Sequence, residues 1–421
     1  MKFVADFHLH SKYSRATSRD MDLENLDKWA RVKGIKVLGT GDFSHPEWFK
    51  SLKEKLEPAE PGLFKLEKQD QGIRFILTNE ISCIYSKKGK VRKIHILIFA
   101  PSFETVEKIN TQLGWIGNLR ADGRPILGMD AKELAKIVLN SSENCLVVPA
   151  HAWTPWFSIF GSKSGFDSIE ECFEDYSKYI YALETGLSSD PLMNWRLSSL
   201  DKITLISNSD SHSPKKIGRE ANVFDTELDY GSIIGAIKTK NPQKFLYTIE
   251  FFPEEGKYHY DGHRLCGISL SPQESKKSGN ICPNCGRPLT IGVLSRVEEL
   301  ADRPAFDKSL ADKPAGAIPF KSLVPLAEII ADALGVLSGA KQVEEEYKNL
   351  IEKFGNEFNV LIDVKLSELE TATLPEITEG INRVREGKLY IEPGYDGVYG
   401  KIKIFATPEE KKIVSHQKTL F

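Results

Sequence analysis

Histidine and acidic residues recur at the ends of short apolar runs in the first half of this chain, and this recurrence constrains the fold most strongly. The first instance is Asp6-Phe7-His8-Leu9-His10, which follows the apolar run 3–5. In an extended segment alternate side chains point to the same face, so His8 and His10 share one side. Such a pair can bind one metal ion; two hydrogen-bonded histidines near a surface are the alternative.

The same arrangement repeats after later apolar runs. The chain has nine histidines, and six of them take such positions if His45 is included. Histidines scattered through a core would not gather at strand ends, so the set predicts a metal centre. The candidate ligands, which are also the candidate catalytic residues, are His8, His10, Asp42, Glu80, His95, His151, Asp210 and His212.

Short apolar strands alternate with helical segments over the same region. Residues 20–34 have apolar side chains at helical spacing, and the strand 35–41 follows directly. Continued alternation through the strand 203–208 predicts a parallel sheet with helices outside it. Polar residues at the carboxyl ends of successive strands are typical of a barrel with its site at that face. We therefore expect an α/β protein with a (β/α) barrel over residues 1–250.

The composition changes beyond residue 252. A segment bearing Gly and Cys extends through residue 288, and several prolines follow between residues 303 and 319. From residue 323 apolar residues return at helical spacing, which indicates core packing rather than a cofactor site. We expect a small zinc-binding module over residues 251–300 and a mainly helical C-terminal domain over residues 301–421.

The six cysteines divide into two sets. Cys83, Cys145 and Cys172 are isolated in apolar surroundings and are expected to be buried thiols. The others belong to two pairs, His263 with Cys266 and Cys282 with Cys285, each separated by two residues. This spacing predicts a tetrahedral Zn²⁺ site that stabilises a segment too small for its own core. His259 remains open as the fourth ligand, and three neighbouring free thiols are the alternative.

Composition narrows the function classes. The 421 residues carry a formal net charge of -3, so any surface that binds phosphate must be local. No apolar run approaches the length of a membrane span, and no signal-peptide pattern precedes His8. We expect a globular cytoplasmic protein without membrane contact.

The ordered ligand set resembles that of the PHP family, metal-dependent phosphoesterases built on a distorted (β/α)7 TIM-like barrel. The family pattern of His-x-His, an Asp-His pair, Glu, His, His and Asp-x-His maps onto the eight candidate ligands. The resemblance implies two or three ions, with Glu80 as a bridge, and hydrolysis by metal-activated water. One position departs from the pattern, because Phe43 follows Asp42 and His45 lies two residues further on. Whether His45 is a ligand is open.

Other carboxylates could orient the ligand histidines from behind. Glu184, Asp6 and Asp167 are candidates, and solvated carboxylates at strand ends are the alternative, favoured for Asp167. Nitrogen-rich ligation suits zinc, iron or manganese. We expect Zn²⁺ at the cysteine site and at the barrel site, with Mg²⁺ or Mn²⁺ available for catalysis.

The combination of this barrel, the cysteine module and a helical tail resembles the endonuclease Q family of archaeal DNA repair enzymes. Residues 149–157 (PAHAWTPWF) and 282–290 (CPNCGRPLT) carry the resemblance. It implies hydrolysis of the phosphodiester 5′ to a deaminated base (uracil, hypoxanthine, xanthine) or an abasic site. A small-molecule phosphomonoesterase of the histidinol-phosphatase type and a non-catalytic DNA- or clamp-binding module are the alternatives.

Further residues are candidates for contacts with DNA. Trp153, Trp156 and Phe157 follow His151 and could line a pocket for an extruded base, or pack in a loop core. Lysines and arginines after His212 and in the turn 87–93 could contact phosphates, or form solvated faces. The three that follow His212 are Lys215, Lys216 and Arg219.

The last residues suggest a protein partner. Residues 417–421 (QKTLF) resemble the start of the motif that binds the sliding clamp, PCNA, with a glutamine three residues before an aliphatic residue. The paired aromatic residues that should follow are absent, because the sequence stops at residue 421. Either the motif is cut there, which makes PCNA a candidate partner, or the likeness is a coincidence.

Overall fold

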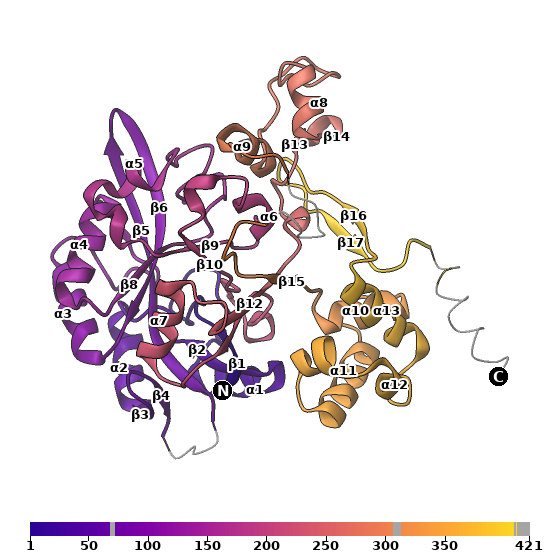
Figure 1. Cartoon of the computed structure of the whole chain (residues 1–421), viewed down its shortest axis with the longest axis horizontal. Helices are drawn as coiled ribbons and strands as arrows, with labels where there is room; N and C mark the ends of the chain where they lie inside the picture. Colours follow the sequence, from indigo (N-terminus) through magenta and orange to yellow (C-terminus); the bar gives the residue numbers. More distant parts are fainter. Residues whose placement is uncertain (68–71, 306–312, 408–409, 411–421) are drawn as a thin grey trace.

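The computed structural model describes residues 1–67, 72–305, 313–407 and 410, and its central element is a mixed sheet of eleven strands (Figure 1). The main hydrogen-bonded path is β15–β12–β11–β1–β2–β5–β4–β3; β6 and β7 pair with β5, and β8 pairs with β6. The strands are β1 (Lys2–Asp6), β2 (Ile35–Gly39), β3 (Leu56–Pro58), β4 (Phe64–Leu66), β5 (Arg74–Lys87), β6 (Lys90–Ala100), β7 (Ile126–Leu127), β8 (Leu146–Pro149), β11 (Ala221–Asp225), β12 (Phe245–Glu250) and β15 (Phe320–Ser322).

The strand directions confirm the α/β class but not a closed barrel. β1, β2 and β5 run parallel, as the alternation predicts. β5 and β6 are instead joined by the two residues Lys88 and Gly89, both with positive φ, which form a hairpin rather than a helical crossover. Consequently β6 is antiparallel to β5 and to β8.

Two further strands lie next to this sheet. β9 (Ala182–Glu184) and β10 (Thr204–Ile206) form a parallel pair. β9 lies beside β8, and a parallel bridge between Leu9 and Ser211 brings the end of β10 to the end of β1. The carboxyl ends of β1, β8, β9 and β10 therefore approach one another, which is the property that the metal-centre prediction requires.

Helices flank the sheet. α1 illustrates their local determinants: Asp22 caps its first turn by accepting from the Asn25 amide, and Gly34 ends it at a φ of 89°. Leu23, Leu26 and Ala30 form its buried face. The prediction of a helix over residues 20–34 is confirmed. The helices of this part are α1 (Leu23–Lys33), α2 (Pro46–Lys55), α3 (Phe103–Gly114), α4 (Ala131–Ser141), α5 (Ile169–Phe173), α6 (Pro191–Asn194) and α7 (Tyr230–Thr239).

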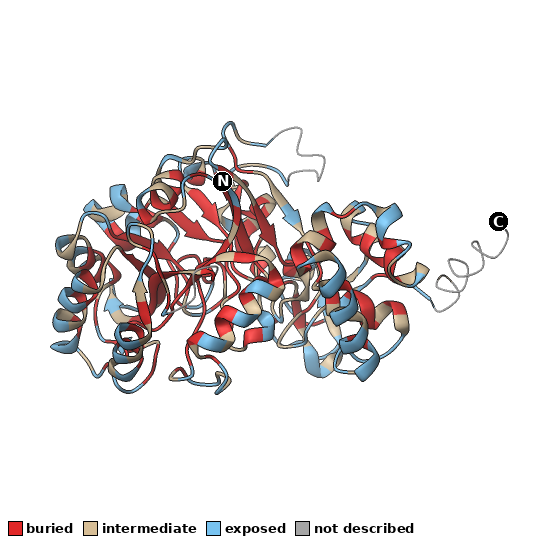
Figure 2. Ribbon diagram, turned by 90° about the horizontal axis from the view of Figure 1, so that it is seen from below, coloured by how far each residue is buried: buried red, intermediate tan, exposed pale blue. Residues whose placement is uncertain are grey.

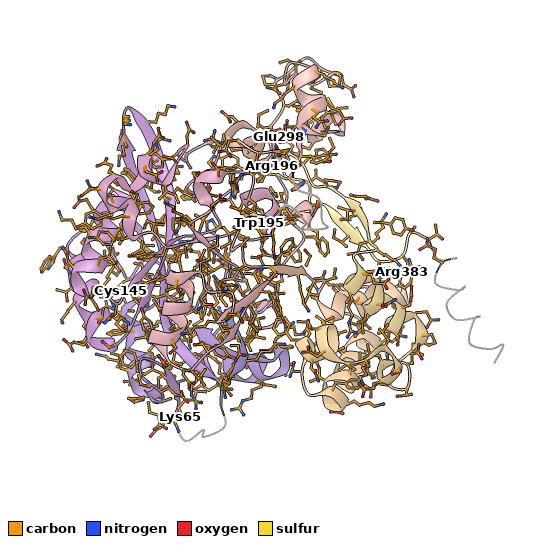
Figure 3. All side chains as sticks on the ribbon, in the orientation of Figure 1. Lys65, Cys145, Trp195, Arg196, Glu298 and Arg383 are labelled. Carbon is orange, nitrogen blue, oxygen red and sulfur yellow. The ribbon has the colours of Figure 1, made fainter. Side chains whose placement is uncertain are left out.

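The cysteine-bearing segment projects from the main body (Figure 1). It comprises β13 (Asp261–His263), β14 (Ile268–Leu270) and α8 (Pro272–Lys277), and α9 (Val293–Leu300) follows it. Arg296 of α9 donates to the carbonyl oxygens of Phe160 and Phe166 at 3.1 and 3.2 Å. Nearby, Arg196 and Glu298 approach to 3.8 Å (Figure 3). These contacts fasten α9 to the loop that follows β8 and to the end of α6.

The C-terminal part is mainly helical, as expected. Its elements are α10 (Leu326–Leu334), α11 (Lys341–Phe354), α12 (Leu366–Leu369), α13 (Pro375–Glu386), β16 (Tyr390–Glu392) and β17 (Lys401–Lys403). A continuous apolar core extends from the sheet into α10 and α13. Figure 2 shows buried residues both in the sheet and in the helices of the smaller part. β15, which the sequence placed in the C-terminal domain, pairs with β12 of the main sheet. The predicted domain limits stay a prediction.

Within the described ranges, no helix is long and apolar enough to cross a membrane.

Candidate metal centre and active site

Six of the eight side chains predicted to bind metal in this part gather in two groups that share one carboxylate. His8, His10, Glu80 and Asp210 form the first group, and Glu80, His95 and His151 form the second. Within each group, one potential ligand atom per residue lies within 4.8 Å of the others. His8 and His10 follow β1, His151 follows β8 and Asp210 follows β10. Strand ends that are remote in sequence therefore meet at one place.

Glu80 and His95 meet because of the register between β5 and β6. His95 pairs with Ser82, two residues from Glu80, so both side chains lie on one face of the hairpin. Glu80 Oε1 is 2.7 Å from His95 Nδ1 and 2.9 Å from His151 Nε2. Glu80 Oε2 is 3.2 Å from His10 Nε2 and 3.5 Å from His8 Nε2. One oxygen of Glu80 thus faces each group.

The first group has buried ligand atoms without hydrogen bonds. His8 Nε2, His10 Nε2 and Asp210 Oδ1 are buried and make no hydrogen bond with the described residues. His10 Nε2 and Asp210 Oδ1 approach to 3.1 Å. Leaving several such atoms unsatisfied is unfavourable unless another group binds them. A cation between these atoms would satisfy all three, so the donor set fits a metal ion.

Carboxylates behind the first group orient its histidines. Both oxygens of Glu184 lie 3.0 Å from His8 Nδ1, and Glu184 also accepts from the His151 amide at 2.8 Å. Asp42 Oδ1 lies 3.0 Å from His10 Nδ1. Nδ1–H donation to a carboxylate leaves the Nε2 lone pair for a ligand bond. These contacts of Glu184 are those of a carboxylate that orients a ligand histidine.

Asp42 lies outside both groups, although the sequence made it a ligand. Its Oδ2 accepts from the Ser11 amide and from the hydroxyls of Ser11 and Ser14, at 2.6–2.9 Å. Together with the contact to His10, these bonds occupy both carboxylate oxygens. Its contacts are those of a carboxylate that positions a ligand.

The carboxylates also shape the protonation of the site. Burial alone would lower the pKa of His8, but Glu184, Glu80 and Asp210 outweigh it and raise the pKa well above its ordinary value. Burial lowers the pKa of His95 to about 4, against the attraction of Glu80. His95 is therefore neutral at pH 7, the form in which imidazole binds metals, whereas a metal ion at His8 would have to displace its second proton.

Two histidines lie beside the two groups: His212, which the sequence predicts as a ligand, and His45, whose role the sequence leaves open. The His212 ring packs 4.6 Å from the His10 ring, and about a third of its side chain is exposed. His45 precedes α2 and stacks on Tyr13 at 4.5 Å, while Phe43 is buried in the core. Neither histidine joins the two groups.

The other two suggested carboxylates serve different contacts. Asp6 accepts from the Ser209 amide and hydroxyl and from the Gly218 amide, and thereby holds the loop that carries Asp210. Asp167 pairs with Arg296 of α9.

The aromatic residues after His151 divide by burial. Trp153 is 1% exposed and donates to Asn194, which assigns it to core packing, the alternative considered above. Phe157 lies 4.8 Å from the His95 ring, with Lys93 Nζ 5.3 Å from its own ring. Trp156 is 39% exposed and contacts Tyr258. Phe157 and Trp156 therefore remain candidates to border a bound base.

The basic residues after His212 lie at a junction. Lys215, Lys216 and Arg219 line a cavity of about 700 Å³ between α1 and the helices α10 and α11. Lys215 approaches Glu344 of α11 to 3.3 Å. At the tip of the β5–β6 hairpin, Lys87 pairs with Asp130 and Glu174. Lys93 lies over the ring of Phe157, which in turn packs against the candidate ligand His95.

Arg124 is a site residue that sequence reasoning missed. Its Nη1 lies 3.0 Å from Glu80 Oε2. It belongs to the irregular segment between α3 and β7, which carries no motif. No local signal could have placed it, because the contact depends on how this segment folds back.

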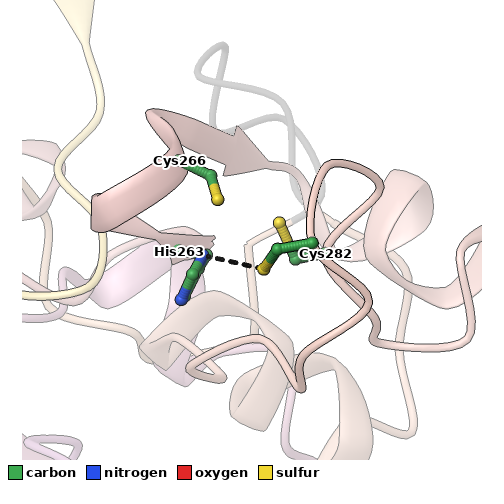
Figure 4. A group of neighbouring side chains, drawn as sticks. His263, Cys266 and Cys282 are labelled. Carbon is green, nitrogen blue, oxygen red and sulfur yellow. Dashed lines mark hydrogen bonds between the residues drawn. The ribbon is translucent and has the colours of Figure 1, made fainter.

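The structure brings the four residues predicted for the cysteine site together. His263, Cys266, Cys282 and Cys285 place their ligand atoms within 4.8 Å of one another, and Cys285 Sγ is 3.6 Å from His263 Nδ1 (Figure 4). His259 is buried beside Tyr260 and does not join the group. One nitrogen and three sulfur donors fit a structural zinc ion.

Comparisons of sequence place this chain among several relatives. A family model described as the MJ0043 C-terminal domain matches residues 325–388. The uncharacterized protein MJ0043 of Methanocaldococcus jannaschii is 36% identical over 262 residues, which cover 60% of this chain and 31% of that protein. The chain thus matches about a third of MJ0043. The uncharacterized protein YqxK of Bacillus subtilis is 29% identical over 419 residues, which cover 96% and 99% of the two chains.

Two solved structures resemble the whole chain. The lesion-specific endonuclease PfuEndoQ from Pyrococcus furiosus is 32% identical, with a TM-score of 0.85 and coverage of 97% of this chain and 98% of that one. Endonuclease Q in complex with a 27-mer duplex with an abasic lesion at the active site is also 32% identical, with a TM-score of 0.84 and coverage of 98% of each chain. Since the likeness extends over sheet, cysteine module and helical part alike, this chain belongs to the endonuclease Q family.

Proposed function

We propose that this protein is a metal-dependent DNA repair endonuclease that hydrolyses the phosphodiester 5′ to a deaminated base or an abasic site. The proposal rests mainly on the position of Glu80, whose two carboxylate oxygens face two adjacent donor groups. A related chain of the same fold is known with an abasic duplex at its active site, which supports DNA as the substrate. The eight ligands proposed from the sequence divide into six that form the groups and two, Asp42 and His212, that contact His10.

In this proposal some residues bind the metal ions and others orient those ligands. Bound ions would neutralise charge on the phosphodiester and lower the pKa of a water molecule. His8, His10 and Asp210 would hold one ion with Glu80, and His95 and His151 would hold a second. Glu184 and Asp42 fix the orientation of His8 and His10 through Nδ1. Nitrogen-rich ligation suits Zn²⁺ or Mn²⁺, while Mg²⁺ is suited to a position rich in oxygen.

Contacts with the lesion would come from the aromatic border of the site. An enzyme that inspects a base must take it out of the stack and hold it against apolar walls. Phe157 lies against His95, and Trp156 is partly exposed one residue before it. Uracil, hypoxanthine and xanthine are the proposed bases. The proposed Zn²⁺ at Cys266, Cys282, Cys285 and His263 would hold the projecting module in shape.

The small-molecule phosphomonoesterase is not favoured, because the likeness to endonuclease Q includes the module and the helical part. The motif proposed for PCNA, residues 417–421, lies outside the described residues, and a partnership with the clamp stays a prediction.

The decisive experiment uses end-labelled duplexes that carry one uracil, one hypoxanthine or one abasic site, with Mn²⁺ or Mg²⁺ supplied. We expect a nick 5′ to the lesion that is absent with undamaged DNA, with chelator and with Asp210→Asn. Asp225→Asn, at an exposed carboxylate on the end of β11, is the matched control and should cut normally. Release of phosphate from a generic monoester without any nick would overturn the proposal.

A further inference from the structure

Arg124 brings a positive side chain against the two donor groups. Its Nη1 is 3.0 Å from Glu80 Oε2, the oxygen that faces His8 and His10. The Arg124 side chain is 28% exposed, whereas that of Glu80 is fully buried, so part of the guanidinium side chain is accessible to solvent.

The backbone around Arg124 is fastened on both sides. The Gly123 amide donates to the Tyr13 carbonyl, and the Ser44 hydroxyl donates to the Gly123 carbonyl, at 3.2 and 3.4 Å. On the other side the Ser82 amide donates to the Pro125 carbonyl at 3.0 Å. The loops after β1 and β2 and the strand β5 therefore all hold this segment. Such support positions a functional side chain more accurately than a free loop can.

Gly123 allows this close approach. A Cβ at residue 123 would overlap Asp42 Oδ2 and Ser14 Oγ, the groups that hold His10 in place. The segment thus passes directly over the carboxylate behind the first group. The next residue, Arg124, is delivered to the edge of the metal centre.

The Arg124 guanidinium has more N–H donors than its contact with Glu80 uses. Arginine has five N–H donors in a planar fork that matches the oxygens of a phosphate, and the contact with Glu80 uses Nη1. Cations bound by Glu80 and its neighbours would repel the guanidinium and weaken its attachment to this carboxylate. An anion that arrives at the same place would then be its favourable partner.

We propose that Arg124 donates to a non-bridging oxygen of the phosphodiester that is cleaved, and that it is a catalytic residue of this site. The proposal rests on the proposed function, since it needs a phosphodiester there. The competing role is that of a counter-ion that holds Glu80, which would act only through the metal centre.

Steady-state cleavage of a lesion duplex gives the first test. We compare Arg124→Ala and Arg124→Lys with Arg120→Ala, a control on the same segment that pairs with exposed Glu47 at 3.1 Å. For Arg124→Ala we expect kcat to fall by about 10²–10³ with KM little changed, because the contact strengthens as charge develops. Arg124→Lys should retain part of the rate, and Arg120→Ala should match the wild type. All variants should hold the same metal per chain by elemental analysis.

A phosphorothioate test separates substrate contact from a structural role. Duplexes carry one Rp or one Sp phosphorothioate at the cleaved bond. In the wild type the isomer whose sulfur replaces the oxygen bound by Arg124 should be cut more slowly, and this slowing should largely vanish in Arg124→Ala. Equal slowing in the two proteins, or loss of metal from Arg124→Ala and Arg124→Lys, would overturn the contact with phosphate and leave the counter-ion role. A wild type that cuts no lesion duplex would instead refute the proposed function.

Discussion

At the scale of single residues, Glu184 contacts residues of both ligand groups, although it is far from most of them in the sequence. It contacts His8 Nδ1, accepts from the His151 amide and accepts from Asn208 Nδ2 at 2.9 Å. One buried carboxylate thus orients ligands of both groups. Mutation of such a partner of a ligand histidine typically lowers metal affinity by about 10–100-fold.

Glu184→Gln should therefore weaken metal binding while leaving the ligands in place. We expect the affinity for Mn²⁺ or Zn²⁺ in the main centre to fall about 10–100-fold, because the amide cannot orient and polarise His8 as the carboxylate does. Competition against a chromophoric chelator measures this affinity. Glu133→Gln, at an exposed position on α4, is the control. Equal affinities in Glu184→Gln and wild type would contradict the assigned role.

A second residue-scale prediction concerns pH. Burial, helped by Asp190, raises the pKa of Glu250 to about 8 although three hydroxyl groups donate to it. In the unfolded chain this carboxyl titrates near 4.5. The folded protein therefore binds the proton more tightly, and the free energy of unfolding falls as pH rises from about 4.5 to about 8.

Glu250→Gln removes this titration, so its stability relative to the wild type should rise between pH 5 and pH 9. Urea unfolding at pH 5, 7 and 9 measures the difference, and Glu133→Gln should run parallel to the wild type. A difference between Glu250→Gln and wild type that does not change with pH would show that Glu250 titrates normally in the fold.

At the scale of elements, the cysteine module depends on its ligands and on α9. Its two strands have three residues each and its one helix has six, too few to bury a core of their own. Arg296 fastens α9 to the main body independently of the cysteines. Loss of the metal should therefore unfold the module without detaching α9.

Chelation of the metal proposed at the cysteine site, or Cys282→Ser, should abolish amide protection over residues 259–291 while β1, β2 and β5 stay protected. Hydrogen exchange followed by mass spectrometry reads both regions at once. Cys145→Ser is the control, because Cys145 is a buried cysteine outside the group of four ligands. This variant should leave the module's protection unchanged. Protection of residues 259–291 that survives metal removal would refute a zinc-dependent fold.

At the scale of the whole molecule, two ion pairs join the N-terminal part to the helical part in addition to the pair of Lys215 and Glu344. Lys33 and Glu357 meet at 2.6 Å and are nearly buried, and Glu357 also accepts from the Leu326 amide and the Tyr347 hydroxyl. Lys2 and Asp363 are 4.0 Å apart and more than half exposed. The two pairs form a natural comparison of buried and exposed charges across one junction.

Lys33→Met should destabilise the protein by about 3–5 kcal/mol, because Glu357 would stay buried without its cation. Lys2→Met should cost less than about 1 kcal/mol. Adding Glu357→Gln to Lys33→Met should recover part of the loss, since the amide keeps an acceptor without the charge. Thermal and urea unfolding measure all three variants. Equal effects of Lys33→Met and Lys2→Met would contradict the importance of the buried pair.

The sequence by itself determined the residue types of the site and the order of the elements that carry them. Apolar runs of strand length that end in His8, His10, His151 and Asp210 predict where ligands gather, because strand ends of one sheet meet at one edge. The spacing of His263, Cys266, Cys282 and Cys285 predicts their site because four donors within a short segment have few other ways to meet.

Tertiary structure alone decided the rest. The β5–β6 hairpin replaces a parallel crossover, and its register brings His95 to Glu80. Asp42 is withdrawn behind His10, Trp153 is packed into the core, and Arg124 is placed against Glu80 by a segment without a motif. These outcomes depend on contacts between residues far apart in the chain. The free energies of such contacts cannot be predicted from local sequence patterns.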